Sequence, residues 1–343
     1  MTDFQAAKAV TRGYMAAFDR APADQRLAAL QAHTTPNYSW RGLHPFHEQD
    51  SAESAIDTFW TPFLNAFNAV QRREVIFFAG LNDCDEFESI WTCSMGHFKA
   101  LFDQPWLGIR PTRKTVMIRY AEFHRIEGDR IAETALFVDI LDVIQQAGLW
   151  PLPPMTAASF VHPGPLTNDG QLFAAQDPAE GKKTLATINK MASNISKANA
   201  ILQGKCDAEP LAPHEELSQT WHDDMSWYGP AGIGAVFTID RYVEQHQEPF
   251  RKYLANRVFN GHVARIAEGH YGGFFGWPNL SVTPTGGYMG LPATGQPADM
   301  RVVDVYRRDG DKLAENWVFI DMLHFLNQQG LDVLARLKDV SRT

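Results

Sequence analysis

The stretch Gly310-Asp311-Lys312-Leu313-Ala314-Glu315 repeats the earlier stretch Gly128-Asp129-Arg130-Ile131-Ala132-Glu133 at a constant offset. The match continues without a gap and pairs Phe137, Asp139, Leu141, Gln146 and Gly148-Leu149 with Phe319, Asp321, Leu323, Gln328 and Gly330-Leu331. An internal match of this length indicates two copies of one structural unit. The chain is therefore predicted to be a tandem duplication, and the residues that both copies retain are its first candidates.

The repeat also suggests the domain boundaries. Upstream, Leu107–Thr112 aligns with Met289–Thr294 in the same register, so each copy spans roughly 150 residues, which can bury a core of its own. Between the copies, prolines and glycines crowd 150–154 and 162–165, which predicts an extended, semi-rigid linker. We expect a first domain over residues 1–155, a linker over 156–175 and a second domain over 176–343.

Composition narrows the class of protein. Hydrophobic residues make up 45% of the chain, and no apolar run approaches the roughly 20 residues of a membrane span. The first residues show no secretory signal, and the three cysteines (Cys84, Cys93 and Cys206) lack a paired spacing, so we expect a cytoplasmic protein with reduced thiols. A net charge of -9 argues against a nucleic-acid partner.

The order of local patterns predicts the fold class. Helical spacing of apolar residues opens each copy, at Ala6–Phe18 and at 181–202, whereas strand-like runs dominate later. In the second copy, Arg301–Arg307 and Lys312–Ile320 flank Asp309-Gly310, a pair that tolerates the positive φ of a hairpin turn. Helices followed by antiparallel strands indicate an α+β fold in each copy.

The last strand carries a row of side chains that ends in an acid. Two-residue alternation places Glu315, Trp317, Phe319 and Asp321 on one face, and Asn316, Val318 and Ile320 on the other. Desolvation of Asp321 beside aromatic residues would raise its pKa toward the range of a general acid or base. Asp321 also precedes a helical pattern, so an N-cap role, which would lower its pKa, is an equal alternative.

Several motifs of the second copy resemble the SnoaL-like polyketide cyclases, a family of the nuclear transport factor 2 superfamily. They are Glu315-Asn316-Trp317, Asp321-Met322-Leu323, Asn327-Gln328-Gln329-Gly330 and Gly290-Leu291-Pro292-Ala293-Thr294-Gly295. The resemblance implies two cone-shaped α+β barrels, each with N-terminal helices packed on a curved antiparallel sheet around a deep pocket. It also implies that Asp321, and Asp139 in the first copy, act as general acid and base in a cofactor-free intramolecular aldol closure.

Residues around the two aspartates complete the predicted site. We expect Trp227, Tyr228, His270 and Trp317 to contact the substrate, with Trp40 and His97 in the corresponding places of the first copy. The first copy has Ala135 where the second has Trp317, and Arg113 where it has Gly295. The loss of an aromatic wall and of a turn glycine predicts that the second pocket carries most of the activity.

The sequence therefore predicts an enzyme that performs acid/base chemistry on a small, apolar carbonyl compound. A hydrolase or dehydratase that uses the same aspartate, and a binding protein without turnover, remain the alternatives. The chain shows no metal-ligand set, phosphate loop or nucleophile elbow, so we expect no metal and no cofactor. The halves are expected to pack as an internal pseudo-dimer, with the chain as a monomer or a homodimer.

Overall fold

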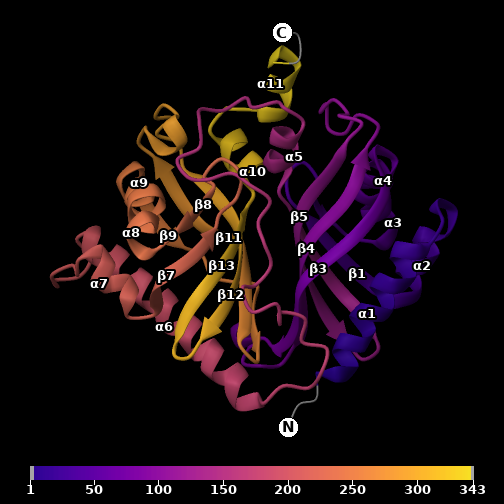
Figure 1. The fold of residues 1–343 in the computed structure, drawn as a ribbon, viewed down its shortest axis with the longest axis horizontal. Helices are drawn as coiled ribbons and strands as arrows, with labels where there is room; N and C mark the ends of the chain where they lie inside the picture. The colour runs from indigo at the N-terminus through magenta and orange to yellow at the C-terminus, as the bar shows by residue number, and fades with distance from the viewer. Residues whose placement is uncertain (1–3, 341–343) are drawn as a thin grey trace. The chain divides into compact units, whose positions relative to one another are not determined.

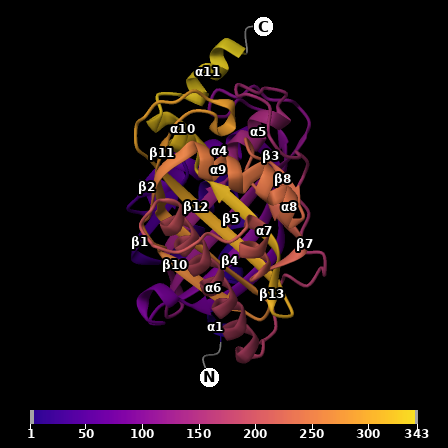
Figure 2. The same ribbon diagram turned by 90° about the vertical axis from the view of Figure 1, so that its left-hand side faces the viewer.

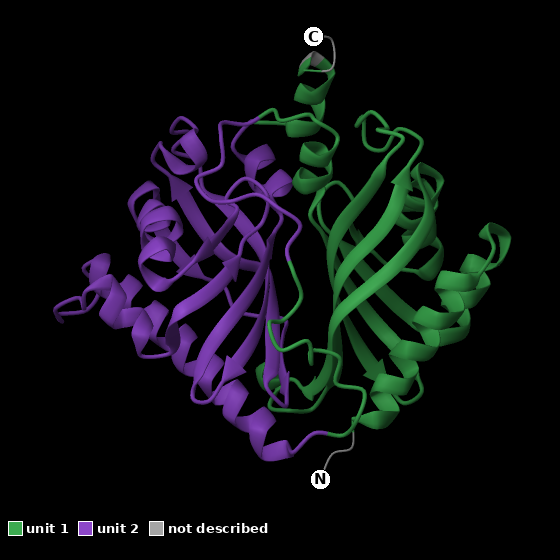
Figure 3. Ribbon diagram, viewed as in Figure 1, with its two compact units in different colours: residues 1–151, 163–175, 331–343 green, residues 152–162, 176–330 purple. Residues whose placement is uncertain are grey.

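The computed structural model describes residues 4–340, and these form two compact units (Figure 3). Unit 1 comprises Met1–Pro151, Pro163–Ala175 and Leu331–Thr343, and unit 2 comprises Leu152–His162 and Gln176–Gly330. The C-terminal segment thus groups with unit 1, whereas the sequence assigned it to the second domain. No helix among the described residues is both long enough and apolar enough to cross a membrane.

The stretch expected to be a linker is divided between the units because its backbone pairs with strand edges in each. In unit 1, the Phe77 amide donates to the Gly170 carbonyl at 2.8 Å, and the Leu172 amide donates to the Phe77 carbonyl at 2.8 Å. In unit 2, Ala158 and Ala235 form an isolated antiparallel bridge. These hydrogen bonds satisfy polar groups of edge strands that would otherwise require water.

Unit 1 packs helices on one six-stranded sheet whose order is β2-β1-β6-β5-β4-β3. The strands are β1 (Thr34–Gly42), β2 (His47–Gln49), β3 (Phe67–Leu81), β4 (Ile90–Phe102), β5 (Thr115–Glu127) and β6 (Arg130–Val138). The helical segments are α1 (Gln5–Arg20), η1 (Ala23–Gln25), α2 (Arg26–His33), α3 (Ala52–Ala55), η2 (Ile56–Trp60), α4 (Thr61–Ala66), η3 (Asp83–Asp85), α5 (Ile140–Gln146) and α11 (Val333–Val340). Helix α1 contacts β3, β4, β5 and β6 and so covers one face of the sheet (Figure 1).

Unit 2 repeats this arrangement with a sheet in the order β10-β11-β12-β13-β7-β8, and β9 pairs with β11. The strands are β7 (Trp221–Tyr228), β8 (Ala235–Phe237), β9 (Leu254–Phe259), β10 (Ala264–Glu268), β11 (Tyr271–Pro284), β12 (Ala298–Asp309) and β13 (Lys312–Ile320). The helical segments are α6 (Pro178–Leu202), α7 (Pro213–Ser218), α8 (Ile239–Tyr242), η4 (Val243–Gln247), α9 (Glu248–Tyr253), η5 (Tyr288–Gly290) and α10 (Met322–Gln328). Helix α6 lies across β10, β11 and β13 (Figure 2).

The two units share one topology, which confirms the tandem duplication. Strands β6 and β13, and helices α5 and α10, begin and end at the positions that the sequence repeat pairs. In each unit the strand that comes first along the chain (β1 or β7) runs parallel to the strand that comes last (β6 or β13). The tryptophan of the first strand is in register with equivalent residues of the repeat: Trp40 with Thr134, and Trp227 with Asn316. Both units are α+β, as predicted, but among the described residues each sheet is open, with edge strands β2 and β3 in unit 1.

The aspartate that both copies retain joins the last strand to the helix after it. Asp321 caps α10: one of its carboxylate oxygens accepts from the His324 amide at 3.2 Å, and the other lies 3.3 Å from Nη1 of Arg301. Asp139 makes the matching contacts in unit 1, with the Asp142 amide at 3.2 Å and with Arg119 at 3.1 Å. Cap and ion pair together hold the helix N-terminus against the neighbouring strand.

The glutamine that both copies retain adds a second connection between the helix and the neighbouring strand. We call the aspartate and glutamine contacts together the helix–strand joint. Gln328 both accepts from the Asp299 amide and donates to the Asp299 carbonyl, each at 3.0 Å. Gln146 binds the backbone of Met117 in the same way, at 3.0 and 2.8 Å. Two polar residues that both copies retain therefore fasten a helix to a strand, so a structural constraint is sufficient to explain why both copies keep them.

We predict that Asp321→Ala lowers the free energy of unfolding by about 2–4 kcal/mol, because it removes the cap and leaves Arg301 without its carboxylate partner. Asp321→Asn should cost less, since an asparagine still caps the helix. Urea denaturation measures both values, with the exposed Asp311→Ala variant as the control that changes stability by no more than about 0.5 kcal/mol. An Asp321→Ala protein as stable as the control would contradict this role.

Candidate functional site

A cavity of about 620 Å³ lies inside unit 2. Helix α6, η4 and α9 line one side of it, and strands β11, β12 and β13 line the other. Aromatic rings and imidazoles contribute a large part of its wall: Trp221, Trp227, Tyr242, His246, Phe250, Phe259, His262, Phe274 and Tyr306. A cavity of this volume, mainly apolar with a few convergent polar groups, is typical of a small-molecule site.

Strand alternation decides which side chains reach the cavity. On β13 the lining residues are Asn316, Val318 and Ile320, and on β12 they are Met300, Val302, Asp304 and Tyr306. The row from Glu315 to Asp321 lies on the opposite face of the sheet and does not line this cavity, so the site roles expected of Asp321 and Trp317 stay predictions. The sequence predicts the alternation of side chains along the strand, and the structure adds which of the two faces lines this cavity.

Asp304 is the acidic group of this cavity. Nδ2 of Asn316 donates to its Oδ1 at 3.1 Å, and the Tyr306 hydroxyl is a second hydrogen-bonding partner. Burial raises the pKa of Asp304 to about 6, against the lowering effect of these two hydrogen bonds. An aspartate with this pKa changes its charge near neutral pH, as a general acid or base must.

Two imidazoles on the wall extend the apolar surface. His246 stacks on Trp227 at 4.2 Å between ring centroids, and His262 stacks on Phe274 at 3.8 Å. Desolvation lowers the pKa of each histidine to about 3, and the nearby Arg265 adds to the effect at His262. Both rings are therefore neutral at physiological pH and offer flat faces to a planar, uncharged ligand.

Only one of the four substrate-binding residues predicted in the second copy lines this cavity. It is Trp227, which projects from β7. Tyr228 and Trp317 stack on one another at 5.5 Å between ring centroids, away from the cavity lining. His270 is half-exposed and lies 3.7 Å from a carboxylate oxygen of Glu180.

The residues predicted for the first copy are buried in unit 1. Trp40 packs against Phe59, with 5.5 Å between ring centroids. His97 is in register with Arg119, on the face that also carries the Arg119–Asp139 ion pair. Burial, with the charge of Arg119, lowers the pKa of His97 to about 4. Trp40 therefore packs against another aromatic ring within unit 1, and His97 lies beside a charged side chain.

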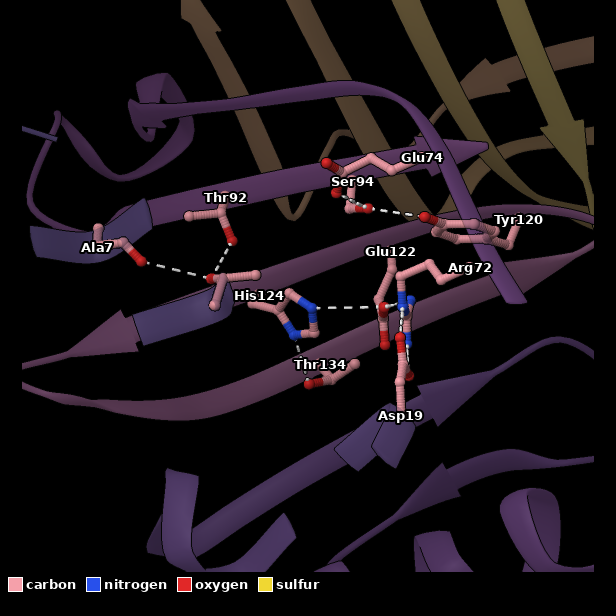
Figure 4. A network of polar contacts seen from close by, with 11 residues as sticks. Ala7, Asp19, Arg72, Glu74, Thr92, Ser94, Tyr120, Glu122, His124 and Thr134 are labelled. Atoms are coloured by element: carbon pink, nitrogen blue, oxygen red, sulfur yellow. Dashed lines mark hydrogen bonds and ion pairs between the residues drawn. The ribbon is translucent and has the colours of Figure 1, made fainter. Parts of the chain in front are cut away.

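A polar network occupies the matching interior of unit 1 (Figure 4). The repeat pairs Glu122 with Asp304, His124 with Tyr306 and Thr134 with Asn316. Nδ1 of His124 lies 2.9 Å from the Thr134 hydroxyl, and Nε2 lies 3.6 Å from the Glu122 carboxylate. Unit 1 therefore also carries an acid at this position, surrounded by other polar groups.

Arg72 fills the space beside this acid. Its guanidinium lies 2.7 Å from Glu122 and 3.0 Å from Asp19 (Figure 4). It also stands over the rings of Phe98 and Tyr120, at 5.0 and 5.3 Å from the ring centroids. Strand register and repeat pair its neighbours with cavity-lining residues of unit 2: Phe98 with Leu280, Tyr120 with Val302 and Glu122 with Asp304. Arg72 itself corresponds to Phe259. The position that a ligand would occupy in unit 2 is thus held in unit 1 by a side chain of the protein.

Comparison with protein families agrees with the resemblance seen in the sequence. The family model described as SnoaL-like polyketide cyclase matches residues 279–329, from within β11 to the end of α10. This segment is SnoaL-like. No curated protein matches the chain.

Three similar solved structures each align with less than half of this chain. An NTF2-like protein from Burkholderia xenovorans LB400 is 10% identical, and the alignment covers 43% of this chain and 97% of that one with a TM-score of 0.33. IdmH from Streptomyces antibioticus, a candidate polyketide cyclase, is 15% identical, and the alignment covers 41% of this chain and 99% of that one with a TM-score of 0.31. A candidate SnoaL-like polyketide cyclase from Jannaschia sp. CCS1 is 17% identical, and the alignment covers 42% of this chain and 91% of that one with a TM-score of 0.31.

The SnoaL-like segment contains Asp304, Tyr306 and Asn316, which the sequence analysis did not select as site residues. One signal was available: Asp304 interrupts the apolar run Val302-Val303-Asp304-Val305, and the aligned position of the other copy, Glu122, is also acidic. An acid at a buried strand position in both copies needs a partner or a function. His246 and His262 lie outside the matched motifs, and no comparable pattern marks them.

We predict that Arg72→Ala lowers the free energy of unfolding by about 3–5 kcal/mol at pH 7, because Glu122 then stays buried without its cationic partner. Burial by itself would raise the pKa of Glu122, but Arg72 and His124 outweigh it and lower that pKa to about 2. The stability that this pair contributes is present above the ordinary carboxyl pKa and is lost as the pH falls through the folded-state value. The penalty should therefore shrink at pH 3.

Urea denaturation at both pH values measures this penalty, and the exposed Arg110→Ala variant is the control. A penalty equal to that of the control, or one that does not change with pH, would show that Arg72 does not balance the charge of Glu122.

Proposed function

We propose that unit 2 is a cofactor-free acid/base enzyme that acts on a small, largely apolar carbonyl compound, with Asp304 as the proton-transferring group. The observation that carries the proposal is a carboxyl group with a pKa of about 6 inside an aromatic cavity of about 620 Å³. The match of residues 279–329 to the SnoaL-like polyketide cyclases supports the same class of chemistry.

Ionised Asp304 would take the proton from the carbon next to a carbonyl group. The resulting enolate carbon would attack a second carbonyl of the same molecule and form a carbon–carbon bond, and Asp304 would return its proton to the new alkoxide. No atom is gained or lost, so the reaction needs no co-reactant. Asn316 and Tyr306 hold the carboxylate in place, and a preset orientation of the base lowers the barrier to proton transfer.

The walls suit an uncharged, apolar part of the substrate. Trp227, His246, Phe274 and His262 form two stacked pairs whose rings carry no charge at neutral pH. Such faces stabilise planar conjugated molecules through stacking and apolar burial. The same walls also support the second candidate function, which is binding of a small molecule without turnover.

We predict that the wild-type protein catalyses hydrogen–deuterium exchange next to the carbonyl of 2-tetralone in D2O, and that Asp304→Asn slows this exchange by about 100-fold or more. Proton NMR measures the rate. The rate should rise with pH through about 6, because the ionised form of Asp304 is the base. Asp321→Asn, whose carboxylate caps α10, is the matched control and should keep the exchange rate of the folded protein.

Each alternative has a distinct outcome in this experiment. Loss of exchange in Asp321→Asn with retention in Asp304→Asn would move the catalytic role back to Asp321. Binding of 2-tetralone without any exchange in the wild-type protein would favour the binding function.

We also predict that Asp304→Asn makes the protein more stable at pH 8 but not at pH 4. The pKa of Asp304 is raised in the folded state, so its contribution to stability is present at low pH and is lost as the pH rises from the ordinary value of 3.8 to about 6. Asparagine avoids the burial of this charge, and the gain at pH 8 should reach up to about 3 kcal/mol. Thermal or urea denaturation at the two pH values measures it, and equal stability of the two proteins at pH 8 contradicts the raised pKa.

A further inference from the structure

A second cavity, of about 760 Å³, adjoins the first within unit 2. It lies between the C-terminal part of α6, the segment 208–213, α7 and α9. We call the cavity that contains Asp304 the inner cavity and this one the outer cavity. Gln247 and Arg251 line both, so the two spaces share a wall.

The shared wall contains an acceptor that no described residue satisfies. Gln247 is 6% exposed, and its Oε1 is buried without a hydrogen-bond partner among the described residues. A buried amide oxygen without a donor destabilises the folded state. A ligand that passes this point with a hydroxyl group or a bound water would satisfy it.

The largely buried charges around the outer cavity do not cancel. Arg251 makes a two-pronged ion pair with Glu216, at 2.9 and 2.6 Å, so these two charges offset each other. Arg257 is 8% exposed and binds the Asn199 amide oxygen and the carbonyls of Arg251 and Leu254, but it has no carboxylate partner within residues 4–340. A buried guanidinium without a counter-charge favours an anion nearby.

The remainder of the outer cavity is amphipathic. Ala198, Ile201, Leu202 and Leu211 supply apolar surface, and Leu202 and Leu211 are 48% and 45% exposed. Lys197 and Lys252 stand at the solvent side, together with the exposed Glu209 and Glu248. Exposed leucines beside lysines suit an apolar segment that ends in a negative charge.

We infer that the two cavities are compartments of one elongated site, whose ligand is an amphipathic anion with its apolar body in the inner cavity and its carboxylate or phosphate in the outer cavity. The inference rests on the proposed function for the identity of the inner compartment. It adds a charge and a length to the substrate class, and it assigns recognition of the charged end to Arg257 and Lys197.

Calorimetric titration with decanoate, decyl phosphate and decanol tests the charge preference, and Asp304→Asn protein is used so that no turnover interferes. Decanoate or decyl phosphate should bind at least about ten-fold more tightly than decanol, and the tighter of the two identifies the headgroup. Equal affinity for decanol and for both anions overturns the inference.

Two variants, each with a matched control, test whether the anion binds in the outer cavity. Lys197→Glu and Leu202→Glu place a negative charge in the outer cavity and should weaken anion binding by about ten-fold or more. Lys190→Glu, on the same helix but outside both cavities, and Leu166→Glu, which is 79% exposed in unit 1, are the matched controls and should stay within about two-fold of the parent protein. Equal loss in variants and controls rejects this site.

Competition with 2-tetralone tests the continuity of the two compartments. Decanoate should displace 2-tetralone, because its chain reaches the inner cavity. Simultaneous binding of both overturns the single elongated site. The proposed function has a separate test: it fails if Asp304→Asn keeps the hydrogen–deuterium exchange rate of the wild-type protein. That result would not alter the affinities measured in the anion titrations.

Discussion

A buried carboxylate at the junction between the last strand and the following helix is the interaction on which both units depend. Asp321 and Asp139 each accept a helix amide and an arginine guanidinium, and the next helix returns a glutamine to the backbone of the neighbouring strand. Removal of a partner from such a joint leaves a buried charge or an unsatisfied polar group. The joint fixes the ends of two adjacent strands, and with them the face that each side chain occupies.

Side chains alternate between the two faces of the sheet in unit 2, so the structural ion pair and the cavity lining lie on opposite faces. One face of β12 and β13 carries Arg301, Trp317 and the row that ends at Asp321. The other face presents Asp304, Tyr306 and Asn316 to the cavity. Both faces contain an acid, but their environments differ: Asp321 is held by a guanidinium and an amide, whereas Asp304 has only neutral hydrogen-bonding partners. Burial in this neutral environment raises the pKa of Asp304.

The two units show how one backbone supports different interiors. Both retain an acid at the same strand position, but unit 1 covers Glu122 with the Arg72 guanidinium, whereas unit 2 has Phe259 at the corresponding place and keeps a cavity. The ion pair lowers the pKa of Glu122, while burial raises that of Asp304. The sequence predicts from Ala135 and Arg113 that the two pockets differ in activity. The structure suggests a different cause for such a difference, which is the side chain of Arg72 on β3.

The sequence by itself determined the duplication, the α+β class of each unit, the hairpin at Gly310 and the alternation of side chains on β13, because repeats, turn residues and periodicity are local properties. It also offered the N-cap as one role for Asp321. Only the tertiary structure decided which face of the sheet the helices enclose, because alternation defines two faces and cannot say which one is covered. For the same reason Asp304, His246 and His262 came together only in the fold, where strands and helices that are distant in sequence meet around one cavity.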